Sequence, residues 1–267
     1  TIIIPAAGLG KRFSDAGYAL SKPLIEVSKK PMIVQAIDDL PLTNQKKVIL
    51  RRDMKDLKAL ESKLRNNYPN ISIQLINSNT DGQASTCLKG IKDLNYDDPL
   101  LISACDNGLI YNNDKFKELF EDLSIDIIVW GCRGYPGATK NPQMYGWINE
   151  ENNIVKKISV KEINKDPLTD PVVTGTFFFR KVSIFESITR DLIRKNLKVN
   201  HEYYIDSSIN NAIKSGYKVI YFEIDYYLCW GTPNDLETYL YWQDCFDKWS
   251  NHKYNKRNDN DFGIKNI

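Results

Sequence analysis

The sequence lacks the residue patterns that mark several broad classes of protein. No apolar run approaches the roughly 18 residues that a membrane-spanning helix needs, so we predict no membrane span. The five cysteines lie far apart without a C-x-x-C pair, and only two histidines accompany them. This scarcity argues against a zinc site and against a disulfide framework, and it favours a reducing, cytoplasmic location.

A strong charge of one sign is also missing. The 36 basic and 34 acidic residues give a net charge of +2. No global field therefore steers the chain to nucleic acid or to anionic lipid, and we expect any anionic ligand to be held by local groups.

The chain starts without methionine, which indicates a trimmed chain or part of a longer polypeptide. The sequence leaves open whether it forms a homo-oligomer.

Short apolar runs alternate with helical patterns over the first hundred residues, which is typical of βαβ units and a mostly parallel sheet. The expected strands are 1–4, 47–51, 71–76, 99–103 and 125–130, and the expected helices are 31–40, 53–66 and 83–94. Strands at 145–148, 154–160 and 172–179 then follow without full helices, which predicts an α+β insertion over the active edge of the sheet. Helices at 182–195, 205–214 and 234–249 and a strand at 217–223 complete a Rossmann-like three-layer α/β/α fold. We assign residues 1–249 to one domain and 250–267 to a polar tail or linker.

A loop of small residues follows the first expected strand and ends in two cations, Lys11 and Arg12. Small residues let main-chain N–H groups approach phosphate oxygens closely. The spacing fits neither a Walker loop nor a dinucleotide-binding fingerprint. Open α/β sheets bind ligands at the carboxyl ends of their strands, so the position of the loop favours phosphate binding over a plain structural turn.

The loop is followed by the segments Ser21-Lys22-Pro23-Leu24 and Lys30-Pro31-Met32-Ile33. This order resembles the sugar-phosphate nucleotidyltransferase (pyrophosphorylase) superfamily, which has a GT-A-like fold of the nucleotide-diphospho-sugar transferase type. The resemblance extends over roughly residues 1–240. It implies that Arg12 and Lys22 contact phosphate, and it implies nucleotide contacts along Ala6, Ala7, Gly8, Leu9, Gly10 and Lys11.

Two further segments resemble nucleotide-binding parts of the same superfamily. The first resembles a base-recognition loop and implies nucleotide contacts from Asp81, Gly82 and Gln83, while Asp81 is also expected to cap the helix that follows. The second places Asp106 after a buried strand, where the family aspartate holds Mg²⁺, and Cys105 beside the nucleotide. A carboxylate that shares Mg²⁺ with phosphates is usual magnesium chemistry, although a loop aspartate can also form a plain Asx-turn.

The second half of the chain resembles the acceptor side of the family pocket. Lys161 takes the place of the lysine that binds the acceptor phosphate. Val160 stands where a glutamate usually precedes that lysine, which leaves Lys157 as a substitute. The same resemblance implies acceptor contacts from Gly146, Thr174, Gly175 and Glu202.

The usual second metal ligand of the family is also replaced. Cys229 occupies the position of that aspartate, two residues before the glycine of Gly231-Thr232-Pro233. A thiol is a poor ligand for Mg²⁺, which prefers hard oxygen donors. Asp225 is therefore a candidate substitute, and the alternative is that Asp106 holds the metal with phosphates and water alone.

These resemblances imply a Mg²⁺-dependent nucleotidyltransferase that couples a nucleoside triphosphate to a sugar 1-phosphate and releases pyrophosphate. Pyrimidine nucleotides (CTP, UTP or dTTP) are favoured, and surface-polysaccharide synthesis is the implied pathway. An alternative is a cytidylyltransferase for a non-sugar phosphate, such as an aminoalcohol phosphate, a phosphonate or a phosphorylated amino acid. A hypothesis of another class is an inactive regulatory domain that binds nucleotide-sugars. A GT-A glycosyltransferase is disfavoured because no D-x-D motif follows a strand.

Overall fold

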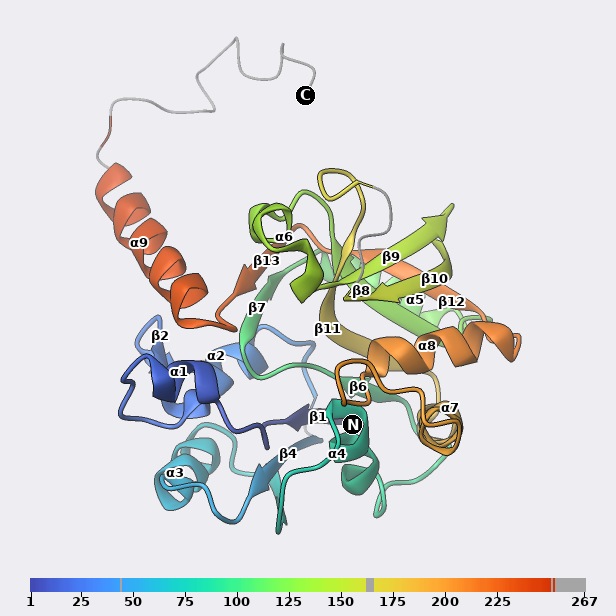
Figure 1. Cartoon of the computed structure of the whole chain (residues 1–267), viewed down its shortest axis with the longest axis horizontal. Coiled ribbons are helices and arrows are strands. Elements are labelled where there is room, and N and C mark those ends of the chain that lie inside the picture. The colour runs from blue at the N-terminus through green and yellow to red at the C-terminus, as the bar shows by residue number, and fades with distance from the viewer. Residues whose placement is uncertain (44, 162–165, 251, 253–267) are drawn as a thin grey trace.

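The computed structural model describes residues 1–43, 45–161, 166–250 and 252, and its central feature is a nine-stranded sheet of order β5-β4-β1-β6-β11-β8-β12-β10-β9 (Figure 1). The strands of this sheet are β1 (Ile2–Pro5), β4 (Lys46–Arg51), β5 (Ser72–Ile76), β6 (Leu100–Ile102), β8 (Ile127–Cys132), β9 (Gly146–Glu151), β10 (Ile154–Val160), β11 (Val172–Phe179) and β12 (Val219–Glu223). The helices are α1 (Lys11–Asp15), α2 (Met32–Asp38), α3 (Leu57–Asn67), α4 (Gln83–Gly90), α5 (Asn113–Glu121), α6 (Pro136–Lys140), α7 (Val182–Arg194), α8 (Ile205–Lys214) and α9 (Pro233–Trp249), with 3-10 turns η1 (Lys22–Leu24) and η2 (Pro142–Met144).

Helices cover both faces of the sheet because the strands have apolar residues at successive positions. In β1, Ile3 packs into one hydrophobic core, whereas Ile2 and Ile4 pack into the other. Successive side chains of a strand point to opposite faces, so a strand that is apolar throughout must be covered on both sides. Helices α4, α7 and α8 cover one face, and α2, α3 and α5 cover the other. The predicted three-layer α/β fold is confirmed.

The later strands differ from the expected insertion. β9, β10 and β11 join the central sheet itself, and β11 lies between β6 and β8, antiparallel to both. The sheet is parallel from β5 to β6 and mixed beyond that point. Phe177 and Phe178 are both buried, in opposite cores, which suits a strand in the middle of a sheet. Periodicity predicts such a strand but not its neighbours.

Several short elements have no strong sequence signal and are not predicted. A hairpin of β2 (Glu26–Val27) and β3 (Lys30–Pro31) precedes α2, and a separate ribbon pairs β7 (Asn107–Ile110) with β13 (Tyr226–Cys229). In this ribbon Asn107 is paired with Cys229, and Ile110 with Tyr226. The ribbon thus joins the end of β6 to the segment before α9, more than a hundred residues later.

The C-terminal helix α9 projects from the body of the molecule (Figure 1). The predicted tail from residue 250 to 267 lies almost wholly outside the described residues. Within the described part of the chain, every helix is too short or too polar to cross a membrane.

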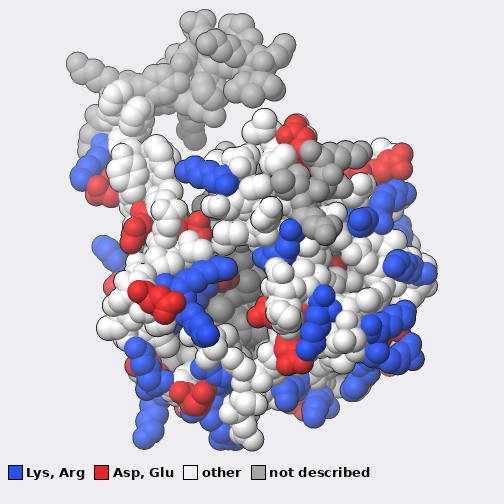
Figure 2. Space-filling model, viewed as in Figure 1, with Lys and Arg blue, Asp and Glu red and all other residues white. Residues whose placement is uncertain are grey.

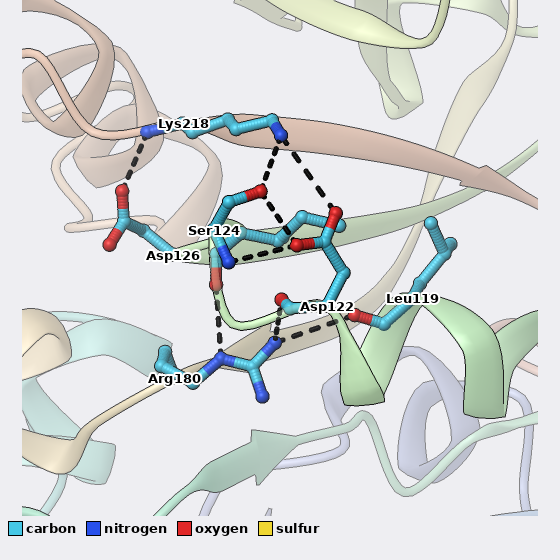
Figure 3. Close-up of polar contacts among 7 residues, drawn as sticks. Leu119, Asp122, Ser124, Asp126, Arg180 and Lys218 are labelled. Carbon is cyan, nitrogen blue, oxygen red and sulfur yellow. Dashed lines mark hydrogen bonds and ion pairs between the residues drawn. The ribbon is translucent and has the colours of Figure 1, made fainter.

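A polar network secures the end of α5 beneath the sheet (Figure 3). Arg180, which directly follows β11, donates hydrogen bonds to the main-chain oxygens of Phe120, Asp122 and Ile125. Across the network, Lys218 donates to Ser124, and its main-chain N–H donates to Asp126. One guanidinium therefore satisfies carbonyls that the last turn of a helix leaves without intrahelical partners.

We expect Arg180→Ala to lower the free energy of unfolding by about 1–2 kcal/mol, because the part-buried carbonyl of Ile125 and two exposed carbonyls lose a charged donor at once. Urea denaturation followed by circular dichroism measures the change. Arg190→Ala is the matched control, since Arg190 only pairs with Glu186 one turn away on an exposed helix face, and such pairs contribute little. Equal losses in the two variants would contradict a structural role for Arg180.

Candidate active site

The loop after β1 forms one wall of a cavity of about 580 Å³. Gly10 ends the loop with a φ of 64°, and a Cβ at this position would lie 3.2 Å from the Cβ of Lys22. A glycine is therefore needed for the loop and the lysine segment to lie together. The cavity is lined by Pro5, Ala7, Gly8, Leu9, Gly10, Lys11, Arg12, Phe13, Lys22, Asn79, Thr80, Gly82, Gln83, Thr86, Glu202 and Gly231.

Ala6 is the exception among the loop residues predicted to contact a nucleotide. Its side chain is buried in the core, and its N–H donates to the carbonyl of Ile49 at 2.9 Å. Ala6 therefore extends the pairing of the first strand and offers no donor to the cavity. The other predicted loop positions, Ala7 to Lys11, line the cavity.

A second loop closes the opposite side of this cavity and begins α4. Gly82 has a φ of 113°, and a Cβ there would lie 2.6 Å from the carbonyl oxygen of Tyr203. Two main-chain hydrogen bonds join the loop to Tyr203. The N–H of Tyr203 donates to the carbonyl of Asp81, and the carbonyl of Tyr203 accepts from the N–H of Ala84. Only glycine allows this close approach.

Asp81 has a different role from the predicted one. Its carboxylate pairs with Lys198 at 2.8 Å on the surface, it forms no side-chain cap on α4, and it does not line the cavity. Thr80 and Thr86, which the sequence does not single out, line it instead, with their hydroxyls 2.5 Å apart. Gly82 and Gln83 therefore line the cavity as predicted, and two threonines line it where Asp81 was expected.

The centre of the site is a pair of cations between two cavities. Arg12 and Lys22 line the first cavity and also a second one of about 230 Å³, as do Gln83 and Gly231. Figure 2 shows this face of the molecule hollowed, with basic and acidic side chains around the hollow. Among the described residues Arg12 forms no ion pair. Its charge is therefore available to an anionic ligand.

Lys22 is fixed by two acceptors. Its Nζ donates to Asp106 Oδ2 at 2.6 Å and to the carbonyl of Gly231 at 2.9 Å. Burial disfavours the charged form of Lys22, but the carboxylate of Asp106 outweighs this effect, so the pKa of the lysine is raised. The amine stays protonated and links the residue before β7 to the segment after β13.

Asp106 lines the second cavity, whereas Cys105 does not. Cys105 packs against the core, and burial raises the pKa of its thiol to about 12. The bend after β6 turns Asp106 to the cavity wall and Cys105 toward the core. The predicted nucleotide contact of Cys105 is therefore not supported.

The structure does not bring Asp225 to Asp106. The N–H of Asp225 donates to Ile110, at the end of the β7–β13 ribbon away from Asn107 and Cys229. Asp235, from the first turn of α9, lines the second cavity and accepts a hydrogen bond from Thr232 at 2.7 Å. The carboxylate near Cys229 is thus Asp235 rather than the predicted Asp225.

The donors present fit a magnesium ion. No cluster of three or more His, Cys, Asp or Glu side chains suited to a metal occurs among the described residues. Mg²⁺ does not require one, because it commonly binds one or two carboxylates and completes its shell with substrate phosphates and water. Asp106 and Asp235 supply hard oxygen donors at the wall of the second cavity.

The second cavity contains most of the predicted acceptor residues. Lys161, Gly146, Thr174 and Gly175 line it, and Lys157 is exposed outside it. The Nζ of Lys161 donates to the carbonyl of Met144 and lies 5.5 Å from the centre of the Tyr204 ring. Burial lowers the pKa of Lys161. The lysine therefore lies in the wall of the cavity rather than in bulk solvent.

Glu202 lies on the other side of the site. It lines the cavity of the glycine loop, together with Gln83 and Thr86, and it is absent from the lining of the second cavity. The turn that carries it places it next to the base loop, because the following residue, Tyr203, is bonded to that loop. The structure thus places Glu202 on the side predicted for the nucleotide.

Asp206 is a half-buried carboxylate that sequence reasoning missed. It lies in the first turn of α8 and lines the second cavity, where its Oδ2 occupies the space beside Gly146 that a Cβ would fill. Burial raises its pKa to about 6, and Lys161 opposes this shift. An acidic residue in the first turn of a helix is usually explained by the helix dipole, so the sequence gives no signal for a site residue.

Asp206 predicts a measurable pH dependence of stability. Its pKa in the folded protein is about 6, above the usual 3.8, so the fold favours the protonated form. This contribution is complete below the unfolded pKa and is lost as the pH rises through 6. We expect Asp206→Asn to gain stability relative to wild type between about pH 4 and pH 7 and to keep a constant advantage above that range.

Urea midpoints of both proteins, measured at each pH, test this expectation. Asp114→Asn, at an exposed first-turn position of α5, is the matched control and should follow wild type across the range. A stability difference between Asp206→Asn and wild type that does not change with pH would rule out the raised pKa.

Comparison with known proteins places this site in a wider context. A model of the nucleotidyl transferase family matches residues 1–250. The fold is similar to that of a nucleoside-diphosphate-sugar pyrophosphorylase from Vibrio cholerae, with 18% identity and a TM-score of 0.73 over 90% of this chain and 100% of the other. It is also similar to the inositol-1-phosphate CTP transferase of T. maritima, with 14% identity and a TM-score of 0.69 over 95% and 97% of the two chains.

A UDP-glucose pyrophosphorylase solved with UDP-glucose gives a comparable match, with 17% identity and a TM-score of 0.68 over 91% of this chain and 98% of the other. At these identities the likeness of the structures concerns the fold. The family model, by contrast, extends over nearly the whole chain, from the first strand through the last turn of α9. The chain therefore belongs to the nucleotidyl transferase family and is a nucleotidyltransferase enzyme.

Proposed function

We propose that the enzyme couples a nucleoside triphosphate to a small phosphorylated acceptor and releases pyrophosphate. The observation that carries this proposal is that Arg12 and Lys22 line both cavities. Two anionic substrates bound side by side need cations at the point where they meet. In this reaction an acceptor phosphate oxygen forms a bond to the α-phosphorus, the bond from that phosphorus to the bridging oxygen breaks, and pyrophosphate leaves.

The cavity of the glycine loop suits the nucleotide. Main-chain N–H groups of Gly8 and Gly10, together with Lys11 and Arg12, would hold the phosphates that leave as pyrophosphate. Gly82 and Gln83 would contact the base. Pyrimidine nucleotides remain our first choice, and the names of two fold neighbours refer to UDP-glucose and to CTP.

The second cavity suits the acceptor. Lys161 would bind the acceptor phosphate, and Lys22 would stabilise the charge that develops on the α-phosphate. Positioning and charge stabilisation suffice for such a transfer, so no nucleophilic side chain is needed. Asp106 and Asp235 would hold Mg²⁺, which neutralises phosphate charge when it is bound.

A sugar 1-phosphate is the acceptor that the family resemblance favours, and its product would serve surface-polysaccharide assembly. We further propose that the enzyme works in the cytoplasm, in keeping with its five free cysteines.

A non-sugar phosphate with a cationic nitrogen is the second candidate for the acceptor. The rings of Tyr145, Tyr204 and Tyr227 and the carboxylate of Asp206 line the same small cavity, and aromatic faces with a carboxylate attract an ammonium group.

Pyrophosphate release tests the proposal. CTP, UTP, dTTP, GTP and ATP are each supplied with Mg²⁺ and with hexose 1-phosphates, phosphocholine, phosphoethanolamine or inositol 1-phosphate. Release that needs one nucleotide, one acceptor and Mg²⁺, and that stops with EDTA, is the expected result. Nucleotide binding without release for any pair would instead support the inactive regulatory domain.

The same panel separates the two acceptor classes. Phosphocholine and its uncharged carbon analogue, 3,3-dimethylbutyl phosphate, have the same shape and differ in the cationic charge. A strong preference for phosphocholine would support the second candidate. Activity with a hexose 1-phosphate alone would support the first.

A further inference from the structure

Arg51 is a buried cation to which the site described so far gives no role. It is the last residue of β4, its side chain is only 8% exposed, and it does not line the cavity of the glycine loop. A charged side chain is costly to bury unless it is paired and hydrogen-bonded. The partners of this guanidinium therefore indicate what it does in the fold.

The guanidinium of Arg51 is bonded to two loops at once. Its Nη1 donates to the carbonyl of Ala7 at 2.7 Å and to Oδ1 of Asn79 at 3.1 Å. Ala7 belongs to the glycine loop and Asn79 to the loop before α4, and both residues line the cavity of the glycine loop. Its Nε donates to Asp53 at 2.7 Å, which supplies the opposite charge. Arg51 thus joins two walls of the cavity from outside it.

Strand register places Arg51 at this junction. β1 and β4 pair in parallel, and this register, continued by two residues, sets Ala7 beside Arg51. On the other edge of β4, Arg51 pairs with Ile76 at the end of β5, and the loop that contains Asn79 follows. β4 is the middle strand of these three, so its last residue lies between the loops that leave its two neighbours.

The bond to Ala7 fixes the orientation of one peptide of the glycine loop. The peptide between Ala7 and Gly8 is trans, so its C=O and its N–H point in opposite directions. Because the carbonyl is turned to the buried Arg51, the N–H of Gly8 points away from the core, on the side where Gly8 lines the cavity. No group in the described parts of the chain accepts a hydrogen bond from this N–H. It is therefore free to donate to a ligand.

We propose that Arg51 is a positioning residue for the nucleotide phosphates. It acts through the peptide between Ala7 and Gly8, whose carbonyl it holds and whose N–H donates to the phosphates that leave as pyrophosphate. Its bond to Asn79 keeps the second loop in place beside the first. This inference rests on the proposed function, because it takes the cavity of the glycine loop as the site of the triphosphate. Arg51 itself touches no substrate.

Calorimetric titration of the whole chain with nucleotides and Mg²⁺, without an acceptor, tests this proposal. The probes are whichever of CTP, UTP, dTTP, GTP and ATP binds wild type most tightly, and the monophosphate of the same base. We expect Arg51→Met to raise the dissociation constant of the triphosphate at least about tenfold and that of the monophosphate less than about threefold. Hydrogen bonds to charged groups are the stronger ones, and only the triphosphate has the phosphates that receive this bond. A residue that only supported the fold would weaken both ligands by the same factor.

Arg51→Lys is the second variant, and it decides the question if Arg51→Met does not fold. Lysine keeps the charge but lacks the planar fork of donors that holds two acceptors in fixed directions. We expect its triphosphate dissociation constant to rise at least about threefold, with the monophosphate again less affected.

Arg52→Met is the matched control. Arg52 is the next residue and is exposed, and its Nε donates to Asn77 at 2.9 Å, outside the cavity. It should bind both nucleotides like wild type, and thermal denaturation should show that each variant is folded at the temperature of the titration.

Equal losses for the triphosphate and the monophosphate, or wild-type triphosphate affinity in the folded Arg51 variants, would overturn the proposal. A wild type that binds no triphosphate would overturn it together with the proposed function. A wild type that binds the triphosphate but releases no pyrophosphate with any acceptor would remove only the proposed function, because the titrations need no turnover.

Discussion

Asp106→Asn is expected to reduce nucleotidyl transfer by about 10³-fold while the fold remains intact, since the loss of one preorganised charge at a reacting phosphate has effects of this order. Asparagine has the same shape but no negative charge. The substitution therefore removes both the carboxylate proposed for Mg²⁺ and the partner that fixes Lys22 at 2.6 Å. The turnover number for pyrophosphate release, measured with the nucleotide and acceptor that the panel identifies, gives the size of the effect.

Asp225→Asn is the matched control for this prediction. It removes the same charge from the same β7–β13 region, but at the opposite end of the ribbon. We expect it to retain nearly full activity and wild-type thermal stability. Strong loss of activity in Asp225→Asn, or full activity in Asp106→Asn, would refute the assignment of the metal-binding carboxylate.

Lys161→Ala is expected to lower kcat/KM for the acceptor by about 10²-fold and to leave nucleotide affinity nearly unchanged. Lys161 lines the second cavity and not the first, so we expect its charge to act mainly on the acceptor phosphate and less on phosphates bound at the glycine loop. Initial rates at varied acceptor concentration, combined with nucleotide titration by calorimetry, separate the two effects.

Lys157→Ala is the companion variant, because this exposed lysine lies on β10 outside the cavity. It should behave like wild type. If Lys157→Ala instead loses acceptor activity and Lys161→Ala does not, the acceptor phosphate binds at the other lysine and the proposed cavity is wrong.

The sequence singles out most of the glycine loop that lines the first cavity, and nucleotide binding there stays a prediction. The loop residues of this cavity are close together in the chain, because one loop after a strand carries the glycines, Lys11 and Arg12 within a few positions. Some of the predicted contact residues do not line the cavities. Ala6 and Cys105 point into the core, and a motif does not specify on which side of the backbone each residue lies.

The acceptor side depended on contacts that no local pattern contains. Asp206 lines the second cavity because Gly146, sixty residues earlier, leaves room for its carboxylate. Asp235 rather than Asp225 lines the second cavity with Asp106, because the pairing of β7 with β13 places Asp225 at the far end of the ribbon. Such long-range pairings are set by packing and strand register rather than by spacing along the chain.

By itself, the sequence determined the three-layer α/β fold, the family and the cationic loop, since apolar periodicity and short motifs are local properties of the chain. The tertiary structure alone decided that β11 lies in the middle of the sheet and that two cavities share Arg12 and Lys22. It also decided which acidic and aromatic side chains line the second cavity. These features depend on which distant segments are buried together, because burial and close packing fix the partners of each strand and the direction of each side chain.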